Sequence, residues 1–229
     1  MPNDLFYLLM LAAPAFLVGS LPIGYWVGLS KGIDLRTRGS GNIGTANVWR
    51  NLGMTWGIAV FLLDVGKGLL PAIIVGAALR GWEGLPLERM YSYWLSVAIF
   101  PVLGHNFSPF LGFKGGKGVA TSFGVAIGVY PHLTIPALAA FFVWCAIAVT
   151  LKISSLGSLL AALAFPIGYV AWASWEGWER QPRWPFVVFT TLTATMVVVL
   201  HRGNIVRLLQ GKENKLSKQP SSTNVDQRP

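Results

Sequence analysis

The chain has 229 residues, of which 53% are hydrophobic and only 12% are charged, and its mean hydropathy is +0.54. Soluble domains carry about a quarter charged residues, so this composition excludes a soluble globular protein. The formal net charge is +9, but the basic residues lie in short loops between apolar runs. That pattern is typical of orientation in a membrane and excludes a nucleic-acid groove. The single cysteine, Cys145, excludes an intrachain disulfide.

Five apolar runs are long enough to cross a bilayer as helices, because about 20 residues span a hydrocarbon core of roughly 30 Å. They are residues 5–29, 54–79, 133–151, 156–175 and 185–200. The first run is too long for a signal-peptide core and follows no basic segment, so we expect it to remain as a transmembrane helix. Two further runs, residues 91–104 and 119–130, reach only about 18 to 21 Å as helices. They are either short spans or a hairpin that enters and leaves by one face.

Charge favours the seven-span arrangement, because basic residues concentrate on the cytoplasmic side. Seven spans place thirteen Lys and Arg in the inner loops and tail. The outer loops then hold Arg80, Arg89, Arg180 and Arg183, matched by Glu83, Glu88, Glu176 and Glu179. The five-span alternative would leave Lys114 and Lys117 outside without acidic partners.

We therefore predict an all-α polytopic membrane bundle of about seven transmembrane helices, two of them short, with the N-terminus out and the C-terminus in. Residues 1–210 are expected to form a single membrane domain. Residues 211–229 are expected to be a polar tail, largely disordered after its first few residues. Six tryptophans then fall near the outer interface, where amphipathic rings settle: Trp82, Trp94, Trp172, Trp175, Trp178 and Trp184.

The first inner loop, residues 39–50, reads GSGNIGTANVWR. Glycines let backbone N–H groups converge, and an arginine forks onto phosphate oxygens. The loop thus indicates an anion-binding surface, and the alternative is a flexible loop whose arginine only orients the protein. Its candidate side chains are Ser40, Asn42, Thr45, Asn47 and Arg50.

The second apolar run contains two charged residues, Asp64 and Lys67. At i and i+3 they share a helix face and can pair, which lowers the cost of keeping charge at membrane depth. Ionisable residues there indicate function, and a structural ion pair that locks two helices is the alternative.

The third loop, residues 104–121, reads GHNFSPFLGFKGGKGVAT. Gly115, Gly116, Lys117 and Gly118 lead into an apolar helix, so backbone N–H groups, the positive helix end and an ammonium group would meet at one place. This arrangement predicts a phosphate site. It is not a Walker A loop, because no glycine lies five residues before Gly116. In addition, Gly118 stands where a Walker A loop has the Ser or Thr that binds magnesium. Nucleotide hydrolysis is therefore excluded. The alternative is a simple glycine turn, which leaves the lysines unexplained.

Two further polar patches lie at the predicted inner ends of helices. In residues 152–158, Ser154 and Ser155 either cap the next helix or contact a substrate. In residues 201–213, His201 and Asn204 share a helix face at i and i+3, and His201 alone is more typical of an interfacial residue than of a base. In the seven-span arrangement all five patches lie on one side of the membrane.

These motifs, together with residues 19–24 (GSLPIG), resemble those of the acyl-phosphate-dependent glycerol-3-phosphate acyltransferases of bacteria. They occur in the same order as in that family and extend over about 200 residues. The resemblance implies an integral enzyme of phospholipid synthesis in the cell (inner) membrane, with its active site facing the cytoplasm. It implies transfer of a fatty acyl group from acyl phosphate to the 1-hydroxyl of glycerol 3-phosphate, giving lysophosphatidic acid. It also implies a functional link to the enzyme that makes acyl phosphate, and neither cofactor nor nucleic-acid partner.

The resemblance also assigns residues. Ser40 and Arg50 are implied to be essential, and the loop around Lys117 is implied to bind glycerol 3-phosphate. His201 and Asn204 are implied to support activity, and Glu213 to support structure. The family's usual Ala-Thr pair in the first motif reads Thr45-Ala46 here. The predicted catalytic residues are Ser40, Arg50, Lys117, His201 and Asn204. The predicted substrate or phosphate contacts are Asn42, Thr45, Asn47, Lys67, His105, Gly115, Gly116, Gly118, Thr121, Ser154 and Ser155. Asp64 and Glu213 are predicted to be structural, and no metal ligand is predicted.

Acyl phosphate is a mixed anhydride with a good leaving group, so no covalent acyl-enzyme is required. The proton of the attacking hydroxyl goes either to His201 as general base or to a phosphate oxygen of the substrate, and the second route is preferred, with His201 hydrogen-bonding the substrate. Two other classes stand as alternatives. A transporter for a phosphorylated metabolite would show an inverted repeat, and none is evident. A non-catalytic membrane partner would leave the five polar patches unexplained.

Overall fold

The computed structural model describes residues 4–178 and 183–216, and its elements there are all helices. In chain order they are α1 (Asp4–Ser20), α2 (Ile23–Ser30), α3 (Thr45–Leu52), α4 (Met54–Arg80), α5 (Leu87–Ala98), α6 (Phe100–Asn106), the short 3₁₀ helix η1 (Pro109–Leu111), α7 (Val119–Gly128), α8 (Thr134–Thr150), α9 (Ser154–Trp175), α10 (Trp184–Leu200) and α11 (Arg202–Leu209). The predicted outer charges Glu179 and Arg180, and the tail beyond residue 216, lie outside the described residues.

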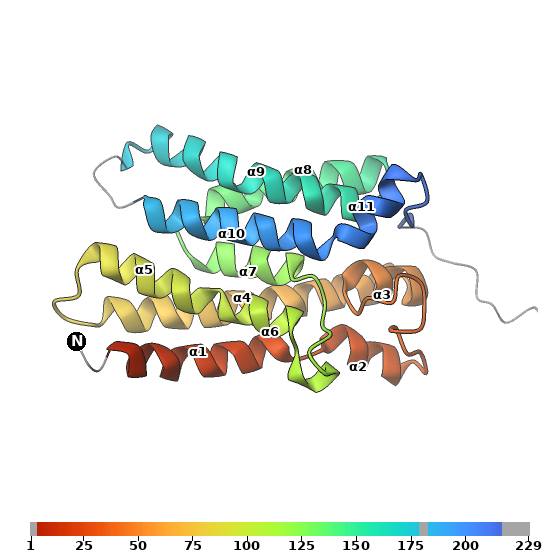
Figure 1. Ribbon diagram of the computed structural model, residues 1–229, viewed down its shortest axis with the longest axis horizontal. Coiled ribbons are helices and arrows are strands. Elements are labelled where there is room, and N and C mark those ends of the chain that lie inside the picture. Colours follow the sequence, from red (N-terminus) through yellow and green to blue (C-terminus); the bar gives the residue numbers. More distant parts are fainter. Residues whose placement is uncertain (1–3, 179–182, 217–229) are drawn as a thin grey trace, which may run out of the picture.

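The helices form two layers with α7 between them (Figure 1). One layer contains α8, α9 and α10, with α9 packed against both neighbours, and the other contains α1, α4, α5 and α6. The first loop, α3, α11 and the turn between α8 and α9 lie at the end of the bundle opposite the N-terminus (Figure 1). Polar segments that are far apart in sequence are therefore close neighbours at one end.

Within the part of the chain that the structure describes, four helical segments are long and apolar enough to cross a membrane: Asp4–Ser30, Met54–Arg80, Leu87–Leu111 and Ser154–Trp175. The pair α10 and α11, bent by 59°, makes a fifth if it counts as one span. The apolar run at 91–104 is thus part of a 25-residue segment rather than a short one, whereas α7 has only 10 residues and α8 has 17. Seven spans and their orientation stay predictions.

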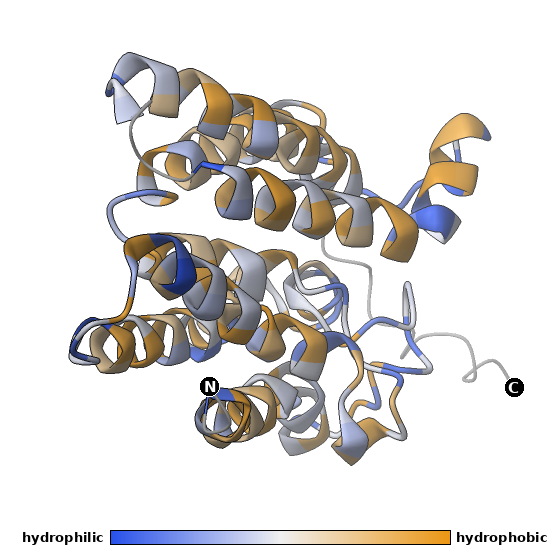
Figure 2. Ribbon diagram, turned by 60° about the vertical axis from the view of Figure 1, so that its left-hand side comes forward, coloured by the Kyte–Doolittle hydropathy of each residue, from blue (hydrophilic) through white to orange (hydrophobic). Residues whose placement is uncertain are grey.

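The outer surface of the bundle is apolar. Leu62, Ile74 and Phe142 are each more than 60% exposed, as expected for side chains that face lipid. Figure 2 shows the long helices mainly in hydrophobic colours, with hydrophilic segments gathered in the connections and in α11. The predicted membrane class is confirmed by this surface and by the apolar helices.

The first apolar run is interrupted, contrary to the single helix expected over residues 5–29. Pro22 has no N–H group to donate, and α1 ends at Ser20. Two side chains from elsewhere bind the carbonyls at the break: the hydroxyl of Ser108 donates to Ser20 O at 2.6 Å, and Lys67 Nζ donates to Leu21 O at 2.9 Å. The break therefore joins α1 to α4 and to the segment after α6.

Trp94, one of the tryptophans predicted near the outer interface, is buried within the bundle. It is only 2% exposed, and its indole N–H donates to Ala72 O at 2.8 Å. Trp175 and Trp184, in contrast, are 84% and 54% exposed. An aromatic residue near a helix end is thus placed at the surface or in the core by tertiary packing, which the sequence pattern did not reveal.

Helices α4 and α7 cross closely because glycines face each other's backbone. A Cβ atom on Gly68 would lie 2.2 Å from Thr121 O, and one on Gly124 would lie 2.0 Å from Val65 O. Small residues allow such close approach between helices in a membrane, where packing rather than water exclusion drives association. This crossing holds the start of α7 against α4.

We expect Gly68→Ala to destabilise the protein by about 1–3 kcal/mol, because the added methyl group overpacks the crossing. Gly66→Ala is the matched control in the same helix, since a Cβ there meets nothing within 4 Å. Thermal unfolding in detergent measures both. The prediction fails if the two variants unfold at the same temperature.

Candidate active site

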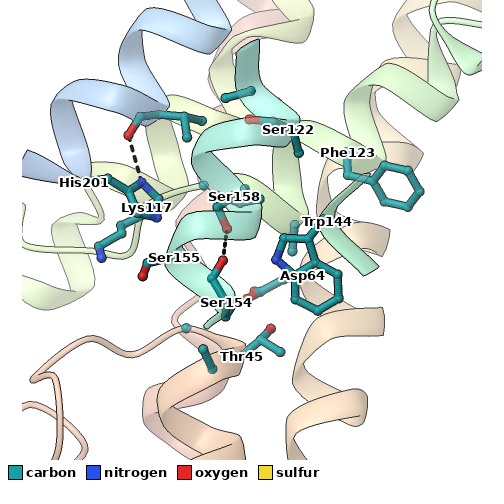
Figure 3. Close-up of a pocket in the computed structure, with 18 of the residues that line it drawn as sticks. Thr45, Asp64, Lys117, Ser122, Phe123, Trp144, Ser154, Ser155, Ser158 and His201 are labelled. Atoms are coloured by element: carbon teal, nitrogen blue, oxygen red, sulfur yellow. Dashed lines mark hydrogen bonds between the residues drawn. The ribbon is translucent and has the colours of Figure 1, made fainter. Parts of the chain in front are cut away.

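One cavity, partly open to its surroundings, lies between the two helix layers. Figure 3 shows the polar side chains of α3, α4, α7, α9 and the α10–α11 bend around it. Thirteen of the predicted site residues line it: Ser40, Asn42, Thr45, Asn47, Arg50, Asp64, His105, Lys117, Gly118, Ser154, Ser155, His201 and Asn204. Five predicted residues do not: Lys67, Gly115, Gly116, Thr121 and Glu213.

Asn47 organises the first loop. Its side-chain amide donates to Leu35 O, Arg38 O and Asn42 O at 2.8–3.1 Å, and its Oδ1 accepts the N–H of Ser40 at 3.1 Å. Asn47 is only 1% exposed, and these bonds use both ends of its amide. Its geometry is therefore that of a residue that holds the loop in shape while its neighbours line the cavity.

Arg50 is 3% exposed and is held from outside the first loop. Its Nε donates to Lys215 O at 2.9 Å, and its NH2 group donates to Asn214 O at 3.0 Å. A guanidinium has five N–H donors, so three remain for a ligand in the cavity. Burial lowers the pKa of Arg50, and the nearby Glu213 carboxylate opposes that shift.

The glycine loop differs from its expected geometry. The N–H groups of Gly115 and Gly116 donate to Asn106 O and His105 O, both at 3.0 Å, so they are not directed at a phosphate. Glycine is needed at 116 for another reason, because a Cβ there would lie 2.0 Å from His105 Nε2. The two glycines fasten the loop to α6. The N–H groups that lack a partner within a helix belong instead to the first turn of α7, which lines the cavity.

The first turn of α7 has the features of the predicted anion site. Gly118 caps the helix in the left-handed region, with φ of 73°, and Gly118, Val119 and Ala120 line the cavity. The first N–H groups of a helix have no partner within it, and the helix dipole makes this end positive. Lys117, directly before the cap, adds a full positive charge.

Lys117 begins a chain of polar contacts. Its Nζ donates to Asn204 Oδ1, Asn204 Nδ2 donates to Glu213 Oε1 at 2.8 Å, and Arg207 Nε donates to Glu213 Oε2 at 2.9 Å. Burial lowers the pKa of Lys117 to about 8, with Glu213 acting in the opposite direction and two arginines adding to the shift. Lys117 thus lies in the cavity wall with Asn204 as its hydrogen-bonding partner.

Asp64 and Lys67 form the predicted pair, with Oδ1 and Nζ 2.8 Å apart and both side chains 4% exposed. Asp64 was predicted to be structural and Lys67 to contact the substrate, but the structure places them the other way round. Asp64 lines the cavity, and Lys67 turns away from it to the α1–α2 break. His105 Nδ1 lies 3.8 Å from Asp64 Oδ1, also beside the cavity. Thr121 is fully buried at the α4–α7 crossing.

The serines at the start of α9 do not cap it. The cap position is Ile153, with no side-chain cap bond, and Ser158 Oγ donates to Ser154 O at 3.0 Å. Ser155 is 6% exposed, and its hydroxyl has no hydrogen-bond partner among the described residues. A buried hydroxyl in a cavity wall without a partner fits contact with a ligand better than capping.

His201 lies at the bend between α10 and α11 and is 3% exposed. Its Nδ1 lies 2.8 Å from Val197 O. Because a carbonyl oxygen can only accept, Nδ1 carries the proton, and Nε2 of the neutral ring is a hydrogen-bond acceptor.

The sequence did not reveal the apolar part of the cavity. Four rings from α4, α7 and α8 form one wall, with centroids 4.8–6.5 Å apart and planes within 8–23° of each other: Phe61, Phe123, Phe141 and Trp144. Alanines line much of the remainder, and Phe165 lies eleven residues along α9 from Ser154, roughly 16 Å. Ser122 and Thr193 also line the cavity and were missed, because nothing in an apolar helix marks which side faces a cavity.

Among the described residues, no group of three or more His, Cys, Asp and Glu side chains is arranged to hold a metal ion. The bundle and cavity together define an integral membrane protein with a cationic site at the mouth of an apolar slot.

Comparison with known proteins gives the family. The model of the glycerol-3-phosphate acyltransferase family matches residues 9–211, and the chain belongs to that family. The glycerol-3-phosphate acyltransferase of Geobacter sulfurreducens is 43% identical over 208 residues, which cover 90% of this chain and 96% of the relative. That of Synechocystis sp. is 40% identical over 226 residues, 97% of this chain and 96% of the relative.

Two solved structures have the same fold. Both are crystal structures of PlsY (YgiH), an integral membrane glycerol 3-phosphate acyltransferase. The glycerol 3-phosphate form has a TM-score of 0.76 and 34% identity, and the lysophosphatidic acid form has 0.74 and 33%. Each comparison covers 91% of this chain and 95% of the other.

Proposed function

We propose that this protein transfers a fatty acyl group from acyl phosphate to the 1-hydroxyl of sn-glycerol 3-phosphate and releases lysophosphatidic acid and inorganic phosphate. The observation that supports it best is the two-part cavity: Arg50 and Lys117 at one end, and a slot of aromatic and alanine side chains at the other. Both the donor and the product of this reaction carry an anionic group and a long apolar chain.

The cationic end suits two phosphate groups. Arg50 retains three N–H donors after its bonds to Asn214 O and Lys215 O, and Lys117 stands directly before the α7 N-terminus. Such preorganised donors stabilise charge that develops on carbonyl and phosphate oxygens, and one of them contributes roughly 3 to 4 kcal/mol. The unpartnered hydroxyl of Ser155 is a further donor in the same wall.

The reaction requires no acyl-enzyme. The 1-hydroxyl oxygen attacks the carbonyl carbon of acyl phosphate, the bond from that carbon to the phosphate oxygen breaks, and the electron pair leaves with phosphate. Nδ1 of His201 pairs with a backbone carbonyl rather than a carboxylate, which is not the geometry of a Ser–His–acid triad. We assign the hydroxyl proton to a phosphate oxygen of the substrate, with His201 Nε2 accepting a hydrogen bond.

The proposed setting is the cell (inner) membrane, with the N-terminus out, the C-terminus in and seven spans. Thirteen of the eighteen Lys and Arg then lie on the cytoplasmic side. The polar end of the cavity, near the first loop and α11, faces the same side, where water-soluble glycerol 3-phosphate is available. Acyl phosphate must come from a second enzyme, which makes that enzyme a functional partner.

The direct test gives the purified protein palmitoyl phosphate and radiolabelled glycerol 3-phosphate with no other enzyme. We expect labelled lysophosphatidic acid with palmitoyl phosphate and none with palmitoyl-CoA. An Arg50→Ala variant serves as the inactive control. The proposal is wrong if neither donor gives product, and its donor is wrong if only the CoA ester does.

The pH dependence tests the role of Lys117. Its pKa of about 8 predicts that kcat/KM for glycerol 3-phosphate falls as pH rises through 8, because the ammonium loses its charge in the free enzyme. The substrate's own second pKa is about 6, so its charge is constant in this range. Lys117→Arg, which keeps its charge, should lack this fall. An identical fall in both enzymes would remove Lys117 from phosphate binding.

His201→Gln separates the two routes for the proton. A general base contributes about 10²- to 10⁴-fold to the rate. If a phosphate oxygen takes the proton, we expect His201→Gln to lower kcat by less than this and to leave the pH profile unchanged. A loss in the general-base range, together with the disappearance of the acidic limb of the profile, would make His201 the base. Full turnover in this variant would remove His201 from both roles.

A further inference from the structure

The chain after α11 returns across the polar end of the bundle. We call residues 211–216 the C-terminal strap. It begins at Gly211, with φ of 66°, and the N–H of Lys212 donates to Arg207 O at 2.8 Å, which closes the turn out of α11. At its other end the N–H of Leu216 donates to Lys152 O at 2.6 Å, and Leu216 is only 9% exposed. The strap is therefore fixed at both ends.

Between its anchors the strap contacts the first loop. Asn214 O and Lys215 O accept the two hydrogen bonds from Arg50, which lies 164 residues earlier in the chain. Two neighbouring carbonyls on one side of a planar guanidinium fix its orientation and leave the opposite edge free. The oxygens that accept these two bonds from Arg50 therefore come from the opposite end of the chain.

The same strap also reaches the second cation. Glu213, with a side chain that is 2% exposed, accepts hydrogen bonds from Asn204 and Arg207, and Asn204 in turn binds Lys117. One six-residue segment is thus connected to Arg50 directly and to Lys117 through one amide.

The choice of partner for Arg50 has a chemical consequence. A carboxylate would orient the guanidinium and also neutralise it, whereas a backbone carbonyl orients it and leaves its full charge for a substrate anion. The one carboxylate of the strap, on Glu213, is bonded to Arg207 and Asn204 instead.

We propose that residues 214–216 are a positioning segment of the acyl-transfer site: the carbonyls of Asn214 and Lys215 hold the Arg50 guanidinium toward the cavity, and Leu216 anchors them on the α8–α9 turn. This proposal rests on the proposed function. It assigns the part of the chain just beyond the membrane bundle to the active site.

The test uses Leu216→Ala in the full chain, which removes the apolar anchor but leaves every backbone group in place. Leu209→Ala is the matched control, because Leu209 is 85% exposed on α11. Leu216→Met, which keeps an apolar side chain of similar volume at this position, should retain the activity that Leu216→Ala loses. Three quantities are measured: kcat and KM with palmitoyl phosphate and glycerol 3-phosphate, the unfolding temperature in detergent, and the rate at which phenylglyoxal modifies Arg50, followed by mass spectrometry.

We expect Leu216→Ala to lower kcat tenfold or more, to speed modification of Arg50 severalfold and to keep its unfolding temperature, while Leu209→Ala matches the unmodified chain. The proposal is overturned if kcat and Arg50 reactivity are unchanged, or if activity falls only together with the unfolding temperature. Should Leu216→Ala fail to fold, Leu216→Val, a smaller truncation, is judged by the same criteria. If the unmodified chain forms no product, the proposed function fails, whereas Arg50 reactivity still decides whether the strap holds the guanidinium.

Discussion

The candidate active site holds one buried cation, Arg50, and one partly buried cation, Lys117, without pairing either directly with a carboxylate. Removing an ion from water costs several kcal/mol even after the protein relaxes, and direct pairing with a carboxylate is the usual compensation. Arg50 and Lys117 are bonded instead to neutral oxygens, those of Asn214, Lys215 and Asn204. The positive charge therefore remains available to a ligand, and the Glu213 carboxylate is hydrogen-bonded to Asn204 and Arg207 instead.

The other buried cation is handled in the opposite way. Lys67 is paired directly with Asp64 and also binds the carbonyl of Leu21 freed by the α1–α2 break. Its charge is satisfied within the protein, and it joins two helices rather than facing the cavity. Arg50 and Lys117, bound to carbonyl and amide oxygens, thus line the cavity. Lys67, paired with a carboxylate, instead supports the fold.

Hydropathy and charge in the sequence were sufficient to predict a helical membrane protein. The polar motifs, and the family that they resemble, selected thirteen of the residues that line the cavity. They did not predict partners that are distant in the chain. The loop motif around Gly116 suggested N–H groups free for phosphate, but two of them are taken by the backbone of α6. The strap that holds Arg50 lies more than 160 residues from it. The apolar slot was hidden for a further reason: helices in lipid are apolar on every side, so periodicity does not show which side faces a cavity.

The slot and the cations contribute different things to binding. In water, burying an acyl chain would yield about 0.8 kcal/mol for each CH₂ group. A chain that already lies in hydrocarbon gains little of this on entering an apolar slot, for the same reason that helices gain little by leaving lipid for one another. The stacked rings of Phe61, Phe123, Phe141 and Trp144 therefore supply orientation more than affinity. In the proposed reaction they would align the acyl chain so that its head group reaches Arg50 and Lys117, and the free energy that discriminates the reacting state would come from those two charges.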